Sequence, residues 1–285
     1  MDRYAEILEG SIDMHLHAKP DFHPRLKNEL EILIDAKKYK MKGIVSKSHY
    51  CINSDRMDLI NSQIEGIKCY GGVVLNPTVG GLNPVAVEAA ILYGGKEVWM
   101  PSFYTKAHKK NFPDFKGAIE VNDEGISIID EEKKLVPVMH TILDLIAQGN
   151  VILGTSHCSE EEIFILVREA KKHKVKKIII THPYCPVPNL DIGRQLELSE
   201  LGVFLELCFF STKLNPEKVD INDFVNTINS IGPERIVLAT DFGQSFNPTP
   251  PDGFLSMVKS LLAKGIKKSD INIMIKDNPN YLLGL

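Results

Sequence analysis

The chain has 285 residues, of which 44% are hydrophobic and 25% are charged, and its formal net charge is -4 at pH 7. This composition is typical of a globular protein, and the slight negative charge gives no reason to expect nucleic acid as a partner. No apolar stretch approaches the roughly 18 residues that a membrane helix needs, and the charged N-terminus is unlike a secretion signal.

Eight short apolar runs, rich in Val and Ile, alternate with helical patterns along the chain. Such runs are typical of buried parallel strands. They cover residues 11–18, 43–50, 68–76, 97–103, 150–157, 177–182, 202–207 and 235–241. This alternation predicts an α/β fold closed into a (β/α)8 TIM barrel, a single domain over residues 1–285. An open doubly wound sheet is the alternative, but the glycine-rich phosphate turn that it needs after the first strand is absent.

Helix signals lie between these strands. Apolar residues recur at helical spacing over 26–39, and Pro84 opens a second helix that the glycine pair at 94–95 closes. Ser159 begins a capping box, Ser-Glu-Glu-Glu, and Pro216 opens a further helix in the same way as Pro84. These helices are the crossovers that a parallel sheet requires.

The spacing is uneven once, after the fourth strand. An insertion of residues 104–136 precedes the next helix, and residues 117–129 within it are predicted to form a hairpin that turns at 122–125. An insertion after the carboxyl end of a strand is placed to cover an active-site mouth. A subunit contact explains it equally well.

The first strand carries the most specific pattern. Residues 11–18 alternate apolar and polar side chains, so Asp13, His15 and His17 share one face. Two imidazoles side by side on a rigid strand can bind a divalent metal. An isolated His-x-His pair is explained at least as well by histidines bonded to the backbone. The metal interpretation therefore depends on ligands from later strands.

Later strands supply such ligands. The carboxyl ends of the strands of a parallel barrel meet on one face. Three apolar runs end there abruptly, in His157, His182 and Asp241, and the second strand adds Lys47 and His49. A satisfied core histidine explains any one of these alone. Several of them beside the His-x-His pair favour a metal site.

These motifs resemble the amidohydrolase superfamily of metal-dependent hydrolases. The resemblance is carried by Asp13-Met-His-Leu-His17, by His157 in Gly-Thr-Ser-His, by His182 in Thr-His-Pro, by Asp241 in Thr-Asp-Phe-Gly, and by Asp277-Asn-Pro-Asn-Tyr near the C-terminus. It covers nearly the whole chain, and it identifies a superfamily and not a substrate.

The resemblance implies that His15, His17 and Asp241 bind a buried metal ion. It implies that His157 and His182 bind a second ion, or are divided between metal and substrate. Zinc is the expected metal, with manganese or iron as alternatives.

The fourth strand departs from the two-metal pattern of the superfamily. Residues 99–102 read Trp-Met-Pro-Ser, where the superfamily places a bridging lysine or glutamate. Glu206 on the seventh strand, or Lys47 on the second, are the substitutes that this chain offers. One metal ion is therefore the simpler expectation, and two remain open.

The expected reaction is hydrolysis of an amide, lactone, ester or phosphoester of a small molecule. A bound metal ion lowers the pKa of water from about 16 to about 7. Asp241 is suited to take the proton and pass it to a leaving group, while His182 or His49 steadies the developing oxyanion. Residues expected to bind the substrate lie at the same strand ends: Lys47, Asn76, Ser102 and Glu206.

Several of these residues have plainer interpretations. His49 is explained equally well by solvation at the barrel rim, and Glu206 by an ion pair with Lys47. Asp13 is expected to support a ligand and not to be one. Cys185 is conceivable as a thiolate ligand, although packing explains it better.

Two other functions stay open. One is a metal-dependent decarboxylase on the same barrel, which should place an arginine at the mouth of the site, and no clear candidate is visible. The other is a barrel that binds a metal or ligand without turnover. The odd cysteine count and the lack of Cys-x-x-Cys favour a cytosolic protein with reduced thiols. We expect a small-molecule substrate and no membrane partner, and a homo-oligomer stays an open alternative to a monomer.

Overall fold

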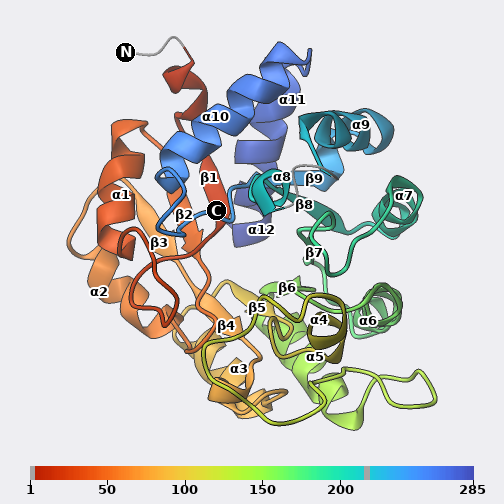
Figure 1. Cartoon of the computed structure of the whole chain (residues 1–285). Coiled ribbons are helices and arrows are strands. Elements are labelled where there is room, and N and C mark those ends of the chain that lie inside the picture. Colours follow the sequence, from red (N-terminus) through yellow and green to blue (C-terminus); the bar gives the residue numbers. More distant parts are fainter. Residues whose placement is uncertain (1–3, 215–218) are drawn as a thin grey trace. The chain divides into compact units, whose positions relative to one another are not determined.

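The computed structural model describes residues 4–214 and 219–285. It is an α/β structure of parallel strands and helices that alternate along the chain (Figure 1). The chain divides into two compact units, and it passes between them several times. The first unit comprises Met1–Lys47, Arg56–Gly71 and Glu206–Leu285, and the second comprises Ser48–Asp55 and Gly72–Leu205. The expectation of a single domain stays a prediction.

The first unit is organised around β1 (Ile12–Leu16), in which all five residues are buried. β1 pairs in parallel with β2 (Gly43–Ser46), which pairs in parallel with β3 (Lys68–Tyr70). β1 also bonds to the end of β9 (Ile236–Ala239), because Asp241 N donates to His15 O at 2.8 Å and His17 N donates to Phe242 O at 2.7 Å. β1 is thus held by a neighbour at each edge.

Helices of this unit follow the strands. They are α1 (Glu29–Lys38), α2 (Met57–Asn61), α8 (Ser211–Leu214), α9 (Ile221–Ile231), α10 (Pro250–Ala263), α11 (Lys268–Asn272) and α12 (Asn278–Leu283), with a π-helical stretch at Ile273–Asp277. α1 begins at Glu29, three residues inside the predicted span, after Asn28 and Glu31 form a capping box. The helix predicted to open at Pro216 has its start outside the described residues, and α9 begins at Ile221 after the cap of Asp220.

Four strands of the second unit pair in parallel in chain order. They are β4 (Gly72–Val74), β5 (Glu97–Trp99), β6 (Ile152–Gly154) and β7 (Ile178–Thr181). Its helices are α3 (Pro84–Leu92), α4 (Lys106–Asn111), α5 (Pro137–Gly149), α6 (Glu160–Lys172) and α7 (Ile192–Glu200). The boundary between the units falls within β8 (Phe204–Cys208), whose end bonds to β9 through Phe209 N and Ala239 O at 2.9 Å. Within the described residues, no helix is long and apolar enough to cross a membrane.

The run predicted as one strand over 68–76 is two strands, β3 and β4, which belong to different units. Glycines at 71 and 72 lie at the break. A Cβ on Gly72 would lie 1.9 Å from the carbonyl oxygen of Glu97, so only glycine lets β4 approach β5 this closely. The sequence pattern showed the apolar run but not this break.

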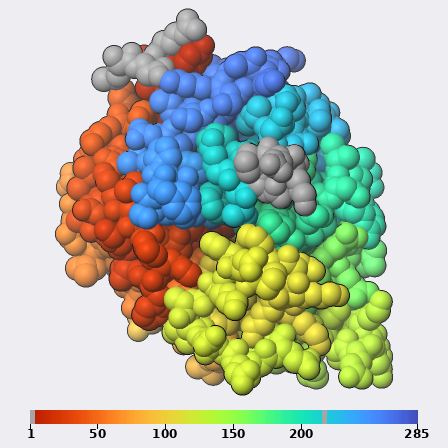
Figure 2. All heavy atoms as spheres, in the orientation of Figure 1, coloured from red at the N-terminus to blue at the C-terminus, as the bar shows by residue number. Residues whose placement is uncertain are grey.

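The insertion also differs from its prediction. Residues 117–129 form no two-stranded hairpin; instead Ile126 N donates to Tyr104 O at 2.7 Å and Lys106 N donates to Ile126 O at 2.9 Å. The segment therefore folds back onto the residues directly after β5. Thr105 caps α4 there by accepting a bond from His108 N. The insertion lies on the surface in Figure 2, where it is yellow to yellow-green.

Candidate metal centre

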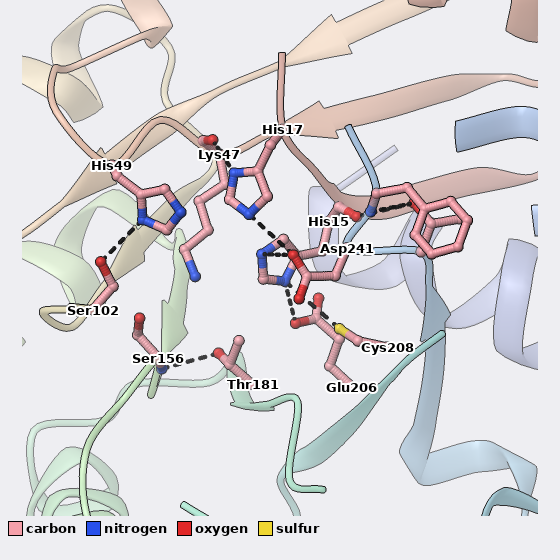
Figure 3. A network of polar contacts seen from close by, with 12 residues as sticks. His15, His17, Lys47, His49, Ser102, Ser156, Thr181, Glu206, Cys208 and Asp241 are labelled. Atoms are coloured by element: carbon pink, nitrogen blue, oxygen red, sulfur yellow. Dashed lines mark hydrogen bonds and ion pairs between the residues drawn. The ribbon is translucent and has the colours of Figure 1, made fainter. Parts of the chain in front are cut away.

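The first unit brings three of the predicted ligands together. His17 Nε2 lies 3.0 Å from Asp241 Oδ1, and His15 Nε2 lies 3.6 Å from the same oxygen (Figure 3). All three residues are buried, and one donor atom from each lies within 4.8 Å of the others. Imidazole nitrogens and a carboxylate at this spacing are a donor set that suits zinc and related ions.

The second nitrogen of each ring is bonded in a way that sets the tautomer. His17 Nδ1 lies 2.9 Å from the carbonyl oxygen of Lys47, which can only accept, so we assign the proton to Nδ1. His15 Nδ1 lies 2.8 Å from Glu206 Oε2, and the same assignment follows when that carboxylate accepts. A neutral ring with its proton on Nδ1 presents its Nε2 lone pair to Asp241. This is the arrangement found in histidine ligands.

Burial keeps both rings neutral. Desolvation is the main cause that lowers the pKa of His15 to about 3 and that of His17 to about 4. The positive charges of Lys47, for His15, and of Arg25, for both rings, lower these pKa values further, while the carboxylate of Asp241 opposes the shift. A histidine must be neutral to bind a metal ion, so the environment favours the ligating state.

The 3.0 Å contact between His17 and Asp241 tests whether a metal fits. With the proton on Nδ1, a lone pair on Nε2 faces a carboxylate oxygen, and two acceptors at this distance repel each other. A positive charge between them, a proton or a metal ion, removes the repulsion. Because His15 Nε2 converges on the same oxygen, the three residues fit a metal ion.

Asp13 joins β1 to the end of β9 behind these ligands. Its carboxylate accepts hydrogen bonds from Thr240 Oγ1 at 2.6 Å, Thr240 N at 3.0 Å and His15 N at 3.3 Å. Burial raises the pKa of Asp13 to about 7, against the effect of these bonds. Asp13 thus positions the backbone of His15 and of the residue before Asp241, as a supporting residue does.

The backbone directly after β9 adopts a strained conformation at Asp241, one of the candidate ligands. Asp241 has a φ of 53°, in the left-handed region that residues other than glycine rarely adopt. Gly243 has a φ of 132°, and a Cβ there would lie 1.8 Å from the carbonyl oxygen of His17. The turn that carries Asp241 is therefore packed directly against the end of β1, and it depends on a glycine.

A second group of donors surrounds the other nitrogen of His15. Glu206 and Cys208 lie there, with Cys208 Sγ 3.8 Å from His15 Nδ1. Burial raises the pKa of Glu206 to about 8, and the charge of Lys47 is the main opposing effect. A neutral imidazole has one lone pair, so the ring cannot serve both groups. The 2.8 Å contact occupies Nδ1 in the hydrogen bond with Glu206, so it is Nε2 of His15 that faces Asp241.

Other predicted site residues form a polar group in the second unit. Asn76 Nδ2 donates to Ser102 Oγ at 2.8 Å and to His49 O at 2.9 Å, and His49 Nδ1 lies 3.0 Å from Ser102 Oγ. All three residues are buried. Their roles in substrate binding and in oxyanion stabilisation stay predictions, as does substrate binding by Lys47 and Glu206.

His157 and His182 also lie in the second unit, with ring centroids 4.9 Å apart. His182 has a φ of 32°, again in the left-handed region. Sequence reasoning missed their neighbour His108, whose Nδ1 lies 2.7 Å from His157 Nδ1. Burial lowers the pKa of His108. The insertion had no periodic pattern that would have placed His108 beside a strand end.

Arg25 is a second residue that sequence reasoning missed. It is buried, its Nε donates to Asp21 Oδ2 at 2.9 Å, and its charge lowers the pKa of His15 and His17. It pairs through the backbone with Gln244, whose side chain donates to Asp241 O at 2.9 Å. Arg25 lies in the irregular segment between β1 and α1, where no periodicity predicts side-chain direction.

Solved structures of low sequence identity have the same fold. An Acinetobacter baumannii protein described as a probable 2-pyrone-4,6-dicarboxylic acid hydrolase, with citric acid bound, has a TM-score of 0.64 at 14% identity, over 97% of this chain and 100% of that one. An amidohydrolase from Burkholderia multivorans with bound zinc has a TM-score of 0.61 at 11% identity, over 96% of this chain and 99% of that one. A 2,6-dihydroxybenzoate decarboxylase complexed with 2,6-dihydroxybenzoate has a TM-score of 0.60 at 10% identity, over 97% of this chain and 100% of that one.

These similarities confirm the predicted fold, the α/β TIM barrel of the amidohydrolase superfamily. A search of curated proteins gives no match. The model of a protein family of unknown function, DUF6282, matches residues 10–206, which is more than half of the chain. The chain therefore belongs to the DUF6282 family and has the fold of amidohydrolases.

Proposed function

We propose that this protein is a metal-dependent hydrolase that acts on an amide, lactone, ester or phosphoester of a small molecule. One observation carries the proposal: the Nε2 atoms of His15 and His17 converge on Asp241 Oδ1 while both Nδ1 atoms are bonded elsewhere. Zinc is the proposed metal, because two imidazoles and a carboxylate are its usual ligands, and manganese or iron are alternatives. The zinc bound to the Burkholderia amidohydrolase supports this choice.

A metal ion held by His15, His17 and Asp241 would supply Lewis acidity, polarising a carbonyl or phosphoryl oxygen and lowering the pKa of water to about 7. Asp241 has two carboxylate oxygens, of which Oδ1 faces both histidines. We assign the other oxygen the task of taking the proton from water and giving it to the leaving group. His182 or His49 would donate a hydrogen bond to the developing oxyanion.

Metal content of protein purified without chelator tests the proposal. The wild type should hold about one equivalent of metal at the first-unit site, and His15→Ala/His17→Ala should lose it. The matched control is His140→Ala/His173→Ala, which removes another pair of neighbouring histidines, with ring nitrogens 3.0 Å apart. A wild type that holds no metal and takes up none on reconstitution would contradict the proposal. A second equivalent that persists in the double variant would indicate an ion at His157 and His182.

Turnover is tested with Asp241→Asn. This variant keeps the size of the side chain, so it should retain some metal yet lose hydrolysis of every ester and lactone that the wild type cleaves. Metal binding with no turnover of any compound by the wild type would favour the alternative of a barrel that only binds a metal or ligand.

A metal-dependent decarboxylase is the second candidate function. The observation in its favour is Arg25, a buried cation close enough to lower the pKa of His15 and His17. A guanidinium is a good partner for a carboxylate. The decarboxylase among the solved structures of this fold supports the possibility of such chemistry. Release of CO2 from an aromatic or heterocyclic acid, abolished in Arg25→Met, would favour this function over hydrolysis.

The cellular setting is a further part of the proposal. The odd number of cysteines and the lack of a Cys-x-x-Cys motif support a cytosolic location. The partners that we propose are a small-molecule substrate and a second copy of the chain. Size-exclusion chromatography with light scattering tests the second.

A further inference from the structure

The insertion of the second unit lines a partly open cavity of about 310 Å³. Its walls include Phe103, Phe112 and Phe115, and the cavity lies within residues 103–121. Phe112 and Phe115 are stacked with centroids 5.6 Å apart, and Phe103 meets Phe115 edge-on at 5.4 Å. Aromatic side chains in this arrangement provide flat apolar surfaces for a ring.

The cavity wall has little net charge. Lys109 forms an ion pair with Asp123, and its Nζ also donates to Val121 O at 3.1 Å. Lys116 and Glu120, of opposite charge, both line the cavity and are exposed. These charges balance, so the wall favours a neutral ring over an anion.

His108 links the cavity wall to His157. His108 Nε2 lies 2.6 Å from the carbonyl oxygen of Phe115, which can only accept, so His108 Nε2 carries a proton. In a neutral ring His108 Nδ1 is then an acceptor, and His157 Nδ1 donates to it at 2.7 Å. A neutral His157 therefore has its lone pair on Nε2. The chain of bonds from Phe115 through His108 fixes the tautomer of a predicted ligand.

We propose that this cavity binds a planar aromatic ring of the substrate, with His108 as the positioning residue that connects the bound ring to His157. The proposal that the bound ring belongs to a substrate rests on the proposed function. The volume of the cavity is large enough for such a ring. An apolar cavity of about 150 Å³ holds benzene, so about twice that volume holds a substituted single ring or two fused rings. Apolar walls with a few polar groups are typical of small-molecule sites.

Calorimetric titration of the full chain with 2-naphthol tests the proposal directly. Binding should be saturable with one site, and decahydro-2-naphthol, the saturated and non-planar analogue, should bind at least tenfold more weakly. Ile119→Trp, which fills the cavity, and Phe112→Ala, which removes a wall, should each weaken 2-naphthol binding at least tenfold. Leu92→Ala, which truncates an exposed side chain of α3 in the same unit, should leave the affinity unchanged. Equal binding of both probes, or undiminished binding by Ile119→Trp, would overturn the proposal.

The role of His108 has a spectroscopic test that a structural role alone would not satisfy. Long-range proton–nitrogen NMR spectra should show His157 as the Nδ1–H tautomer, and 2-naphthol should shift the ring nitrogens of His108 and His157. The His140–His173 pair, also in the second unit, should not shift. Bound 2-naphthol that leaves His108 and His157 unshifted would overturn the link.

Neither measurement requires a metal ion or turnover. Failure of the proposed function would show as absent metal with intact 2-naphthol binding, whereas failure of this inference would show as absent 2-naphthol binding with intact metal content.

Discussion

The two units carry histidine pairs that are built in different ways. In the first unit, His15 lies on β1 and His17 directly follows the end of that strand, and each ring has an oxygen partner of its own at Nδ1. In the second unit, His108 and His157 lie far apart in sequence and orient each other, with the Phe115 carbonyl at the end of the chain of bonds. The first pair is set by a buried strand, and the second by an irregular insertion. We therefore expect the pair His15 and His17, called the strand pair, to be the more rigid. The pair His108 and His157, called the insertion pair, should respond more to a ligand.

Gly243→Ala should have the largest effect, because it breaks the support of the strand pair. The new Cβ would meet the carbonyl oxygen of His17, and the left-handed backbone is strained for alanine as well. We expect the free energy of unfolding to fall by about 3 kcal/mol or more, with loss of metal binding. Urea denaturation measures the change. Gly265→Ala is the control, since Gly265 also has a positive φ but no atom within 4 Å of its Cβ position, and it should cost only about 1 kcal/mol.

Asp13→Ala should come next. It removes the acceptor of three bonds that join Thr240 and His15, and it leaves buried donors without that partner. We expect a loss of about 2–3 kcal/mol in the free energy of unfolding and weaker metal binding. Thermal and urea denaturation measure the first, and titration of the metal-free protein measures the second. Unchanged stability would mean that Asp13 does not hold β1 to β9.

Glu206→Gln should separate orientation from stability at the strand pair. The glutamine keeps the size of the side chain but places an amide, which can donate as well as accept, near His15 Nδ1. We expect metal affinity to fall about 10- to 100-fold, as for other partners of metal-bound histidines, with little change in unfolding. An unchanged metal affinity would show that Glu206 does not set the tautomer of His15.

Ser159→Ala affects the second unit alone. Ser159 forms a capping box with Glu162 at the start of α6, directly after His157 and Cys158. We expect a cost of about 1 kcal/mol in unfolding and no change in first-unit metal content. A change in first-unit metal content larger than the assay error would contradict the expectation that this metal binding does not depend on the start of α6.

Asp35 should show the smallest effect, because it lies outside both pairs. Partial burial would raise its pKa, but hydrogen bonds from Lys27 and Lys38 outweigh burial and hold the pKa of Asp35 below its usual value. Its stabilising contribution is therefore present above the unfolded pKa of about 3.9 and is lost as the pH falls through the lower folded value. We expect less than about 1 kcal/mol, seen as a shallower loss of stability below pH 4 in Asp35→Asn. An identical pH dependence of stability in the wild type and Asp35→Asn would mean that the ion pairs of Asp35 with Lys27 and Lys38 contribute nothing to the free energy of unfolding.

The sequence by itself determined the features that depend on local periodicity. Alternation along 11–18 placed His15 and His17 on one face of a strand, and apolar runs located the later strands and the parallel α/β fold. Capping signals at Ser159 and Pro84 marked the starts of α6 and α3. These predictions succeeded because side-chain direction in a strand or helix follows from residue spacing alone.

Only the tertiary structure decided the contacts between irregular segments. The link from Phe115 through His108 to His157, the burial of Arg25 beside the strand pair, and the break between β3 and β4 follow no period in the sequence. Such contacts depend on how distant segments pack, and a turn such as the one at Gly243 is defined by the backbone that it meets. For this reason the candidate ligands at the strand ends, and partners such as Asp13 and Glu206, could be named from the sequence, while His108 and Arg25 could not.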